Sequence, residues 1–269
     1  MSTAPVRPST PARERPERLS ELAGRFRPAS LANEELLPTA AVFAELLGTP
    51  GLKRGSTIAV HGGRFPGATA LLLALLVGPS ASGSWCAVVG APELGLVAAS
   101  ELGVALDRLV LVPEPGERVA AVAAALLEGC DLVCLRPSGP LAGSEARRLT
   151  ARARERRAVL VVVSGSAAAL APAGAPAAPG MGAGQAGASK GVWNETPDVA
   201  LTVIDGHFVG VEEGSGRITA HLVEVVAQRR RRAPEQVRRW LWLPRPDGRM
   251  APADETMPAP LDLLGTGTT

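Results

Sequence analysis

The chain has 269 residues, of which 46% are hydrophobic, 3% aromatic and 20% charged, and its formal net charge is +2. This length suits one α/β domain of about 150–200 residues with tails. The longest apolar run, residues 70–77, is far shorter than the ~20 residues of a membrane span, and the first ten residues contain no apolar signal core. We therefore expect a cytoplasmic protein with no membrane partner.

The three cysteines, Cys86, Cys130 and Cys134, lie in or beside apolar runs that resemble strands. Their spacing matches neither a zinc site nor a disulfide framework. We expect them to be small buried hydrophobic residues in a reducing compartment, and we expect no metal site.

The N-terminal region divides into a polar arm and a helical segment. Residues 1–15 are rich in Pro, Ser and Arg, which predicts a disordered arm. Residues 16–50 are predicted to be helical, with a second helix over residues 40–47 that ends at Gly48. The first helix is indicated by an apolar stripe at Leu19, Leu22, Ala23 and Phe26.

A regular alternation of patterns follows. Apolar runs typical of strands occupy residues 56–60, 85–89, 108–112, 131–135 and 159–163. Patterns typical of helices lie between them, at residues 68–77, 92–102, 117–127 and 143–156. Such alternation predicts βαβ units, and hence an α/β fold whose parallel sheet is flanked by helices.

The C-terminal half begins with a low-complexity segment. Residues 164–191 are rich in Ala, Gly and Pro, so we expect a flexible loop within a domain that spans residues 51–228. An antiparallel extension is predicted over residues 199–226, with a tight hairpin turn at Asp205–Gly206 and a second turn near residues 214–216. Residues 229–269 are predicted to form an extended, Pro-rich tail. This tail contains two apolar islands, at Trp240, Trp242, Leu261, Leu263 and Leu264 among others.

The segment between the first strand and the first helix of this alternation has the spacing of a phosphate-binding loop. In the frame G-x-x-x-x-G-K-[ST], Gly62, Gly67 and Thr69 match, but Ala68 occupies the lysine position. Lys53 precedes the strand and is expected at the opposite end of the sheet, about 17 Å away. Arg64 is the one cation inside the loop. Backbone N–H groups there are still able to bind an anion, but nucleotide binding by this loop is doubtful and no cofactor is expected.

From about residue 52 to residue 229 the chain resembles the RecA recombinase core. The resemblance rests on residues 52–69 as first strand and phosphate loop, on Cys86-Ala87-Val88-Val89 as second strand, and on ELGV and DRL at residues 101–109. It implies a RecA-like P-loop NTPase fold with an antiparallel C-terminal extension.

The same resemblance places the active residues of the family at positions that have changed. Pro92 stands at the catalytic glutamate position, and Arg136 replaces the carboxylate that holds magnesium. Glu93 is adjacent, but one residue along a helix turns a side chain ~100° away. With the lysine also lost, we expect no ATP hydrolysis and no catalytic residue, because positioning and electrostatic stabilisation provide nearly all of this catalysis.

Arginines form two clusters, and the DNA-binding loops of the family are poorly represented. The first loop is short, at residues 137–142, and the second is the Ala/Gly/Pro segment, which has no arginine or aromatic residue. The arginine clusters, at residues 147–157 and 229–232, are either solvated or partner-binding surfaces, or they contact nucleic acid nonspecifically.

Within this superfamily the chain resembles the RecA-like accessory protein of the bacterial damage-induced mutagenesis cassette. The features are GGRFPGAT, WCAVVG, ELGVALDRLVLVPEPG, LRPSG and EARRLTARARERRAVLVVV. The resemblance implies a non-catalytic adaptor in DNA repair, which supports translesion synthesis in the SOS response to DNA damage. Its implied partners are an inactive Y-family polymerase homologue and a RecA-type recombinase.

We expect Leu19, Leu22 and Phe26, and the two tail islands, to bind partners; the tail tryptophans alternatively pack on the domain. The alternatives are an ATPase that uses Arg64 and a nonspecific DNA-binding repair protein.

Overall fold

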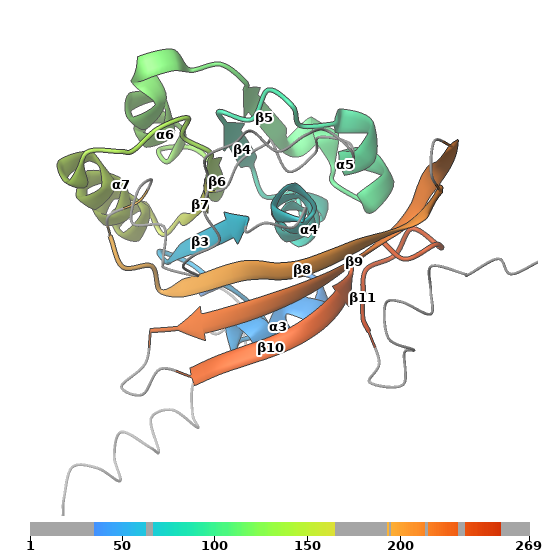
Figure 1. Cartoon of the computed structure of the whole chain (residues 1–269). Coiled ribbons are helices and arrows are strands. Elements are labelled where there is room, and N and C mark those ends of the chain that lie inside the picture. Colours follow the sequence, from blue (N-terminus) through green and yellow to red (C-terminus); the bar gives the residue numbers. More distant parts are fainter. Residues whose placement is uncertain are drawn as a thin grey trace, which may run out of the picture. The chain divides into compact units, whose positions relative to one another are not determined.

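A nine-stranded sheet organises the computed structural model of the chain (Figure 1). The structure describes residues 35–62, 67–164, 193, 195–212, 215–230 and 235–253. Every element below lies within one unit, Leu36–Thr269. None of the helices in the described ranges is long and apolar enough to cross a membrane.

The central part of the sheet is parallel. Its strands are β3 (Thr57–Gly62), β4 (Cys86–Val89), β5 (Leu109–Val112), β6 (Leu132–Leu135) and β7 (Val159–Ser164). They follow the order β3-β7-β6-β4-β5, and β8 runs parallel to β3 on its other side. All five predicted strands are confirmed. The apolar runs of β3, β7, β6 and β4 are buried in the sheet, whereas the edge strand β5 is half-buried.

Helices cover both faces of this parallel region (Figure 1). Helices α4 (Ala68–Ala81) and α5 (Leu96–Leu102) contribute to one apolar core. Helices α6 (Val119–Leu126) and α7 (Gly143–Arg156) contribute to a second core on the opposite face. Helix α4 is the most buried of them, since residues 71–76 are all buried. The predicted α/β class is thus confirmed.

Two short 3-10 helices join these elements, η2 (Leu106–Arg108) before β5 and η3 (Gly116–Arg118) before α6. On the N-terminal side, β1 (Leu36–Pro38) pairs with β2 (Gly51–Lys53) in a separate two-stranded sheet. Between them lie η1 (Ala41–Phe43) and α3 (Ala44–Leu47), which confirm the helix predicted over residues 40–47. It ends at Gly48, whose φ of 70° is the left-handed conformation that glycine adopts readily. The segment predicted to be helical thus also contains a strand.

The antiparallel extension differs from the prediction in two ways. It comprises β8 (Val199–Glu212), β9 (Ser215–Arg229), β10 (Glu235–Trp242) and β11 (Ala251–Pro252). First, Asp205–Gly206 is not a hairpin turn, because β8 continues through it with a register shift between Val203 and Asp205. Residues favoured in turns are also tolerated at a β-bulge. The chain reverses instead between Glu212 and Ser215, close to the second predicted turn.

Second, residues 229–269 are not a continuous extended tail. Glu235–Trp242 pairs antiparallel with β9 and forms the strand β10, while β11 pairs with β10. None of the prolines that suggested a tail lies within β10 itself, and Pro252 is at the end of the short edge strand β11, opposite Leu241. The arm of residues 1–15, the stripe at Leu19, Leu22 and Phe26, residues 165–191, and Leu261, Leu263 and Leu264 lie outside the described residues.

Candidate functional site

The carboxyl ends of the parallel strands form the edge at which an α/β sheet usually binds ligands. The chain leaves β4 toward α5 on one face of the sheet, and it leaves β6 toward α7 on the opposite face. Strands β4 and β6 are neighbours. The two departures make this position a topological switch point, where a crevice for ligands is expected.

The predicted phosphate loop has the expected context beside this position. Strand β3 ends at Gly62 and α4 begins at Ala68, with Thr69 in its first turn. Gly67 caps the helix with a φ of 148°, and a Cβ added there would lie 3.0 Å from side-chain atoms of both Val203 and Val223. The start of α4 therefore packs closely against β8 and β9. Arg64 lies outside the described residues.

Arg136 lies at the switch point, directly after β6. Its Nη1 forms an ion pair with the Glu93 carboxylate and also lies 3.4 Å from Thr69 Oγ1. The Arg136 side chain is only 12% exposed and that of Glu93 is 29% exposed. A guanidinium thus occupies the position beside Thr69 where the resemblance implies a metal-binding carboxylate.

The orientation expected for Glu93 is wrong. The expectation treated residues 92 and 93 as helical, whereas α5 begins only at Leu96 and residues 92–93 form a turn. The 100° helical spacing does not apply in a turn. The pairing with Arg136 had one signal in the sequence, namely that both residues follow apolar runs and so lie at the same edge of the sheet.

Backbone contacts hold the two loops of the switch point together. The Gly90 N–H donates to Val112 O at 2.9 Å, and the Arg136 N–H donates to Val89 O at 2.9 Å. Gly90 has a φ of 80°, and a Cβ added there would lie 2.2 Å from Arg136 O. Only glycine fits this close approach, so the loops after β4 and β6 are locked against each other.

Sequence reasoning missed a second polar pair at the same edge. His61 of β3 and Ser164 of β7 are register partners, and His61 Nδ1 lies 2.6 Å from Ser164 Oγ. Burial lowers the pKa of His61 below its ordinary value because it disfavours the charged imidazolium. The carboxyl ends of these two central strands are therefore joined by a hydrogen bond between a neutral imidazole and the Ser164 hydroxyl.

Trp240 and Trp242 lie on β10, on the side opposite the core. Leu241 between them is fully buried in the core, and alternate residues of a strand point to opposite faces. The Trp240 ring stacks on His207 of β8, with centroids 5.9 Å apart and an interplanar angle of 27°. The two tryptophans are half-buried, so they form an aromatic sheet face, which we call the tryptophan face.

Three of the five arginines of α7 form ion pairs with carboxylates. Arg152 and Arg156 both form ion pairs with Glu128, and Arg147 lies 3.8 Å from Glu195. These pairs reduce the positive potential that a nucleic-acid backbone would need. Within the described ranges no group of three or more His, Cys, Asp and Glu side chains is arranged to hold a metal ion.

Two of the three cysteines, Cys86 and Cys134, are buried as predicted, whereas Cys130 is half-buried. Burial, with a smaller contribution from Asp131, raises the pKa of Cys86 to about 12. Burial also raises the pKa of Cys134 well above its ordinary value. Both thiols are therefore protonated and inert in the folded protein.

Comparison with known proteins shows similarity in the parallel region. The family described as MT3502 N-terminal domain matches residues 45–169, which contain β3 to β7 and α4 to α7. The uncharacterized protein Rv3395c of Mycobacterium tuberculosis (strain ATCC 25618 / H37Rv) is 41% identical over 104 residues. The aligned region covers 38% of this chain and 51% of the relative, so the chain spans about half the length of the curated relative it matches.

Proposed function

We propose that the chain is a RecA-like core of the P-loop NTPase fold that has become a non-catalytic adaptor. The fold assignment is supported by the succession of β3, a glycine-bounded loop and α4 at the carboxyl edge of a parallel sheet. A switch point lies at the same edge, between β4 and β6.

The loss of catalysis is supported most strongly by Arg136. Phosphoryl transfer in this fold needs a cation on the phosphates and a metal ion held by a hydroxyl and a carboxylate. Arg136 contacts the Thr69 hydroxyl itself, and its positive charge repels a divalent cation there. The Glu93 carboxylate, which lies nearby, binds this guanidinium. Ala68 at the lysine position removes the remaining cation of the motif.

The adaptor role is supported by the tryptophan face and by the arginines of α7 that are paired with carboxylates. Half-buried tryptophans on a sheet face are typical anchors of protein–protein contacts. The ion pairs of Glu128 with Arg152 and Arg156 make α7 a weak site for nucleic acid. By the resemblance, the partners are an inactive Y-family polymerase homologue and a RecA-type recombinase, in damage-induced translesion synthesis.

The catalytic part of the proposal is tested by ATP turnover of the purified protein, with and without single-stranded DNA. We expect no rate above background. A measurable rate that Arg64→Ala abolishes would replace the proposal with an active ATPase.

The adaptor part is tested by capture of the polymerase homologue. The double variant Trp240→Ala, Trp242→Ala should lose at least tenfold in affinity, since two anchors of the contact are removed. Trp85→Ala is the matched control, because Trp85 is 42% exposed at a different part of the sheet. Equal loss in both variants, or in neither, places the contact away from the tryptophan face. A steep dependence of DNA binding on salt would instead support a DNA-binding protein.

A further inference from the structure

A cavity of about 500 Å³ lies at the amino ends of the parallel strands, opposite the switch point. It is bounded by residues from β2, the start of β3, the end of α7, the start of β8 and the end of β9. Its charged lining consists of Lys53, Arg54, Arg154, Arg229, Arg230 and Asp198. Five cations thus face one carboxylate.

The turn after β2 brings two of these cations together. Gly55 has a φ of 76°, and its N–H donates to Ala158 O at 3.1 Å. A Cβ added at Gly55 would lie 3.4 Å from the Arg154 Cα, so the turn lies against the last turn of α7. Arg54 and Arg154 are therefore held on neighbouring parts of the cavity wall by backbone geometry.

Asp198 positions the opposite wall and uses its carboxylate to do so. Its Oδ2 accepts a hydrogen bond from the Thr57 N–H at 2.9 Å, and its carbonyl oxygen accepts one from the Arg230 N–H at 2.9 Å. Asp198 therefore fixes Arg230 beside β3.

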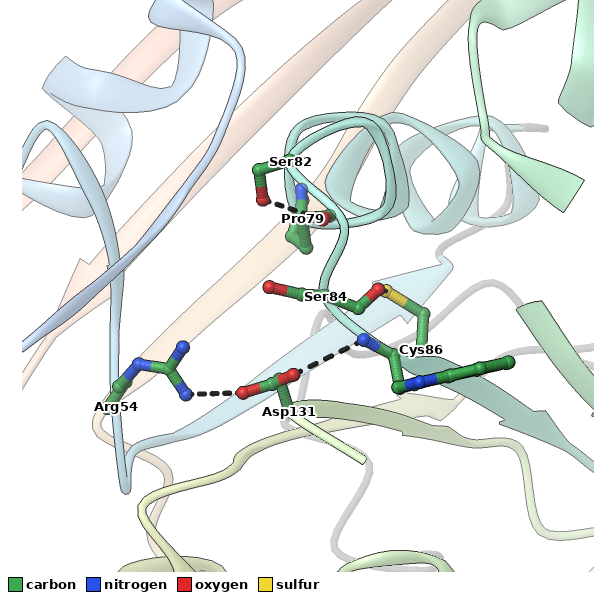
Figure 2. Close-up of polar contacts among 7 residues, drawn as sticks. Arg54, Pro79, Ser82, Ser84, Cys86 and Asp131 are labelled. Atoms are coloured by element: carbon green, nitrogen blue, oxygen red, sulfur yellow. Dashed lines mark hydrogen bonds and ion pairs between the residues drawn. The ribbon is translucent and has the colours of Figure 1, made fainter. Parts of the chain in front are cut away.

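A second carboxylate near the cavity, that of Asp131, directly precedes β6 (Figure 2). Asp131 Oδ1 accepts from Arg54 Nη1 at 2.7 Å, and its Oδ2 accepts from the Trp85 N–H at 3.2 Å. Both carboxylates are thus engaged with groups of the fold, and the wall keeps an excess of positive charge.

We propose that this cavity binds a compact phosphoanion. Arginine presents a planar fork of donors that matches phosphate oxygens, and four of the five cations are arginines. The volume lies within the range of small-molecule sites. No aromatic side chain lines the cavity among the described residues, so it offers no surface for stacking bases. The phosphate group is the recognised element, either in a free oligophosphate or at the 5′ end of a nucleic acid.

Thermal unfolding with tripolyphosphate tests the proposal, with sodium chloride at equal ionic strength as reference. A ligand that binds the folded state raises the Tm in a saturable manner. We expect this rise in the full chain, and we expect at least a tenfold loss of affinity in Lys53→Gln, Arg154→Gln, Arg230→Gln. These three side chains are exposed, so their replacement should leave the Tm without ligand unchanged.

The matched control is Arg118→Gln, Arg148→Gln, Arg245→Gln, which removes the same charge from exposed positions elsewhere. The proposal fails if both triple variants lose affinity equally, if neither does, or if the full chain shows no rise. Poly-glutamate that binds as tightly as tripolyphosphate would also overturn it, because charge alone would then suffice. Should the first triple variant unfold at a lower temperature, the single variant Arg230→Gln provides the same test, with a loss of at least threefold expected.

Competition identifies the source of the phosphate. A 5′-phosphorylated oligonucleotide that displaces tripolyphosphate better than its unphosphorylated form indicates a nucleic-acid end. If neither oligonucleotide displaces tripolyphosphate, the ligand of the cavity is a free oligophosphate. Equal displacement by both shows that the nucleic-acid backbone is bound, which contradicts the compact ligand. None of these outcomes depends on whether the tryptophan face binds a polymerase homologue.

Discussion

The two ends of the same parallel strands differ in how far their positive charges are paired with carboxylates. At the carboxyl edge Arg136 is paired with Glu93 and lies beside Thr69, so the cation is neutralised within the fold. At the amino edge one lining carboxylate faces five cations around an open cavity. Ligands of α/β sheets usually bind at the carboxyl edge, where helix N-termini converge. Among the described residues of this chain, the excess positive charge lies at the other end.

In this molecule the position where the topology favours a ligand site is therefore different from the position where the charged side chains favour one. The strand order still makes a switch point between β4 and β6, but locked loops and an internal ion pair occupy it. The amino edge has no such topological role, yet the turn at Gly55 and the Asp198 hydrogen bonds hold its arginines in place. Recognition in this molecule should therefore follow charge more than topology.

The largest effect is expected from Gly90→Ala, which breaks the locked carboxyl edge. The added Cβ would lie 2.2 Å from a backbone oxygen at a φ of 80°, so both strain and overlap contribute. We expect a loss of about 3 kcal/mol in the free energy of unfolding, measured by urea denaturation. Gly83→Ala is the control, since Gly83 has a φ of 88° with nothing within 4 Å of the added Cβ. Its loss should be about 1 kcal/mol, and equal losses would show that strain alone acts at Gly90.

Asp131→Asn tests the contacts of a carboxylate at the amino edge. The change weakens two contacts, with Arg54 and with the Trp85 N–H. The side chains of Arg54 and Asp131 are partly exposed, at 24% and 33%, so we expect a loss of about 1–2 kcal/mol in the free energy of unfolding. A double-mutant cycle with Arg54→Gln separates the two contacts. A coupling energy near zero would mean that Asp131 acts through the backbone alone.

Glu93→Gln at the carboxyl edge should have a smaller effect than Asp131→Asn. Only the ion pair with Arg136 is weakened, and the Glu93 side chain is 29% exposed, so about 0.5–1 kcal/mol is expected. Urea denaturation at low and high salt measures it, and the loss should shrink as salt screens the pair. Glu114→Gln, an exposed change in the loop after β5, is a control for the removal of a surface charge.

The smallest effect concerns pH and His61. Burial places its folded pKa below the ordinary 6.5, so the unfolded chain takes up the proton first as pH falls. The contribution of His61 to stability is therefore complete above about pH 6.5 and is lost progressively below it. Unfolding free energies at pH 7.5 and 5.5 should differ less in His61→Asn than in the unmodified chain. An identical difference in both proteins would assign the pH dependence to other groups.

The parallel region was predictable because its chemistry is local. Each strand from β3 to β7 is a short, nearly continuous apolar run, and α7 was predicted with its observed ends, Gly143–Arg156. Buried parallel strands need such runs whatever their neighbours are. The position of Arg136 at the end of β6 followed from the same pattern.

The antiparallel region and the ion pair were less predictable because they depend on partners. Asp205–Gly206 has the composition of a turn, and only pairing with β9 makes it a bulge in a long strand. The prolines at positions 234 and 244 suggested a tail, but they leave β10 room for eight residues between them. The meeting of Glu93 with Arg136 requires the adjacency of β4 and β6, which no periodicity encodes. The Asp198 contacts of the basic cavity likewise depend on the β3–β8 pairing.

The central place of β3 has a consequence for how the chain acquires its structure during synthesis. Strand β3 pairs on one side with β7, as at His61 and Ser164, which are 103 residues apart. On the other side it meets the start of β8, where Thr57 and Asp198 are 141 residues apart. A nascent chain that has completed β3 and α4 must therefore wait for most of the remaining sequence before these surfaces are covered. Because α4 is apolar over residues 71–76, we expect chaperones to bind it while it is exposed in the unfinished chain. We also expect slow folding, because the contacts of β3 join residues far apart in the sequence.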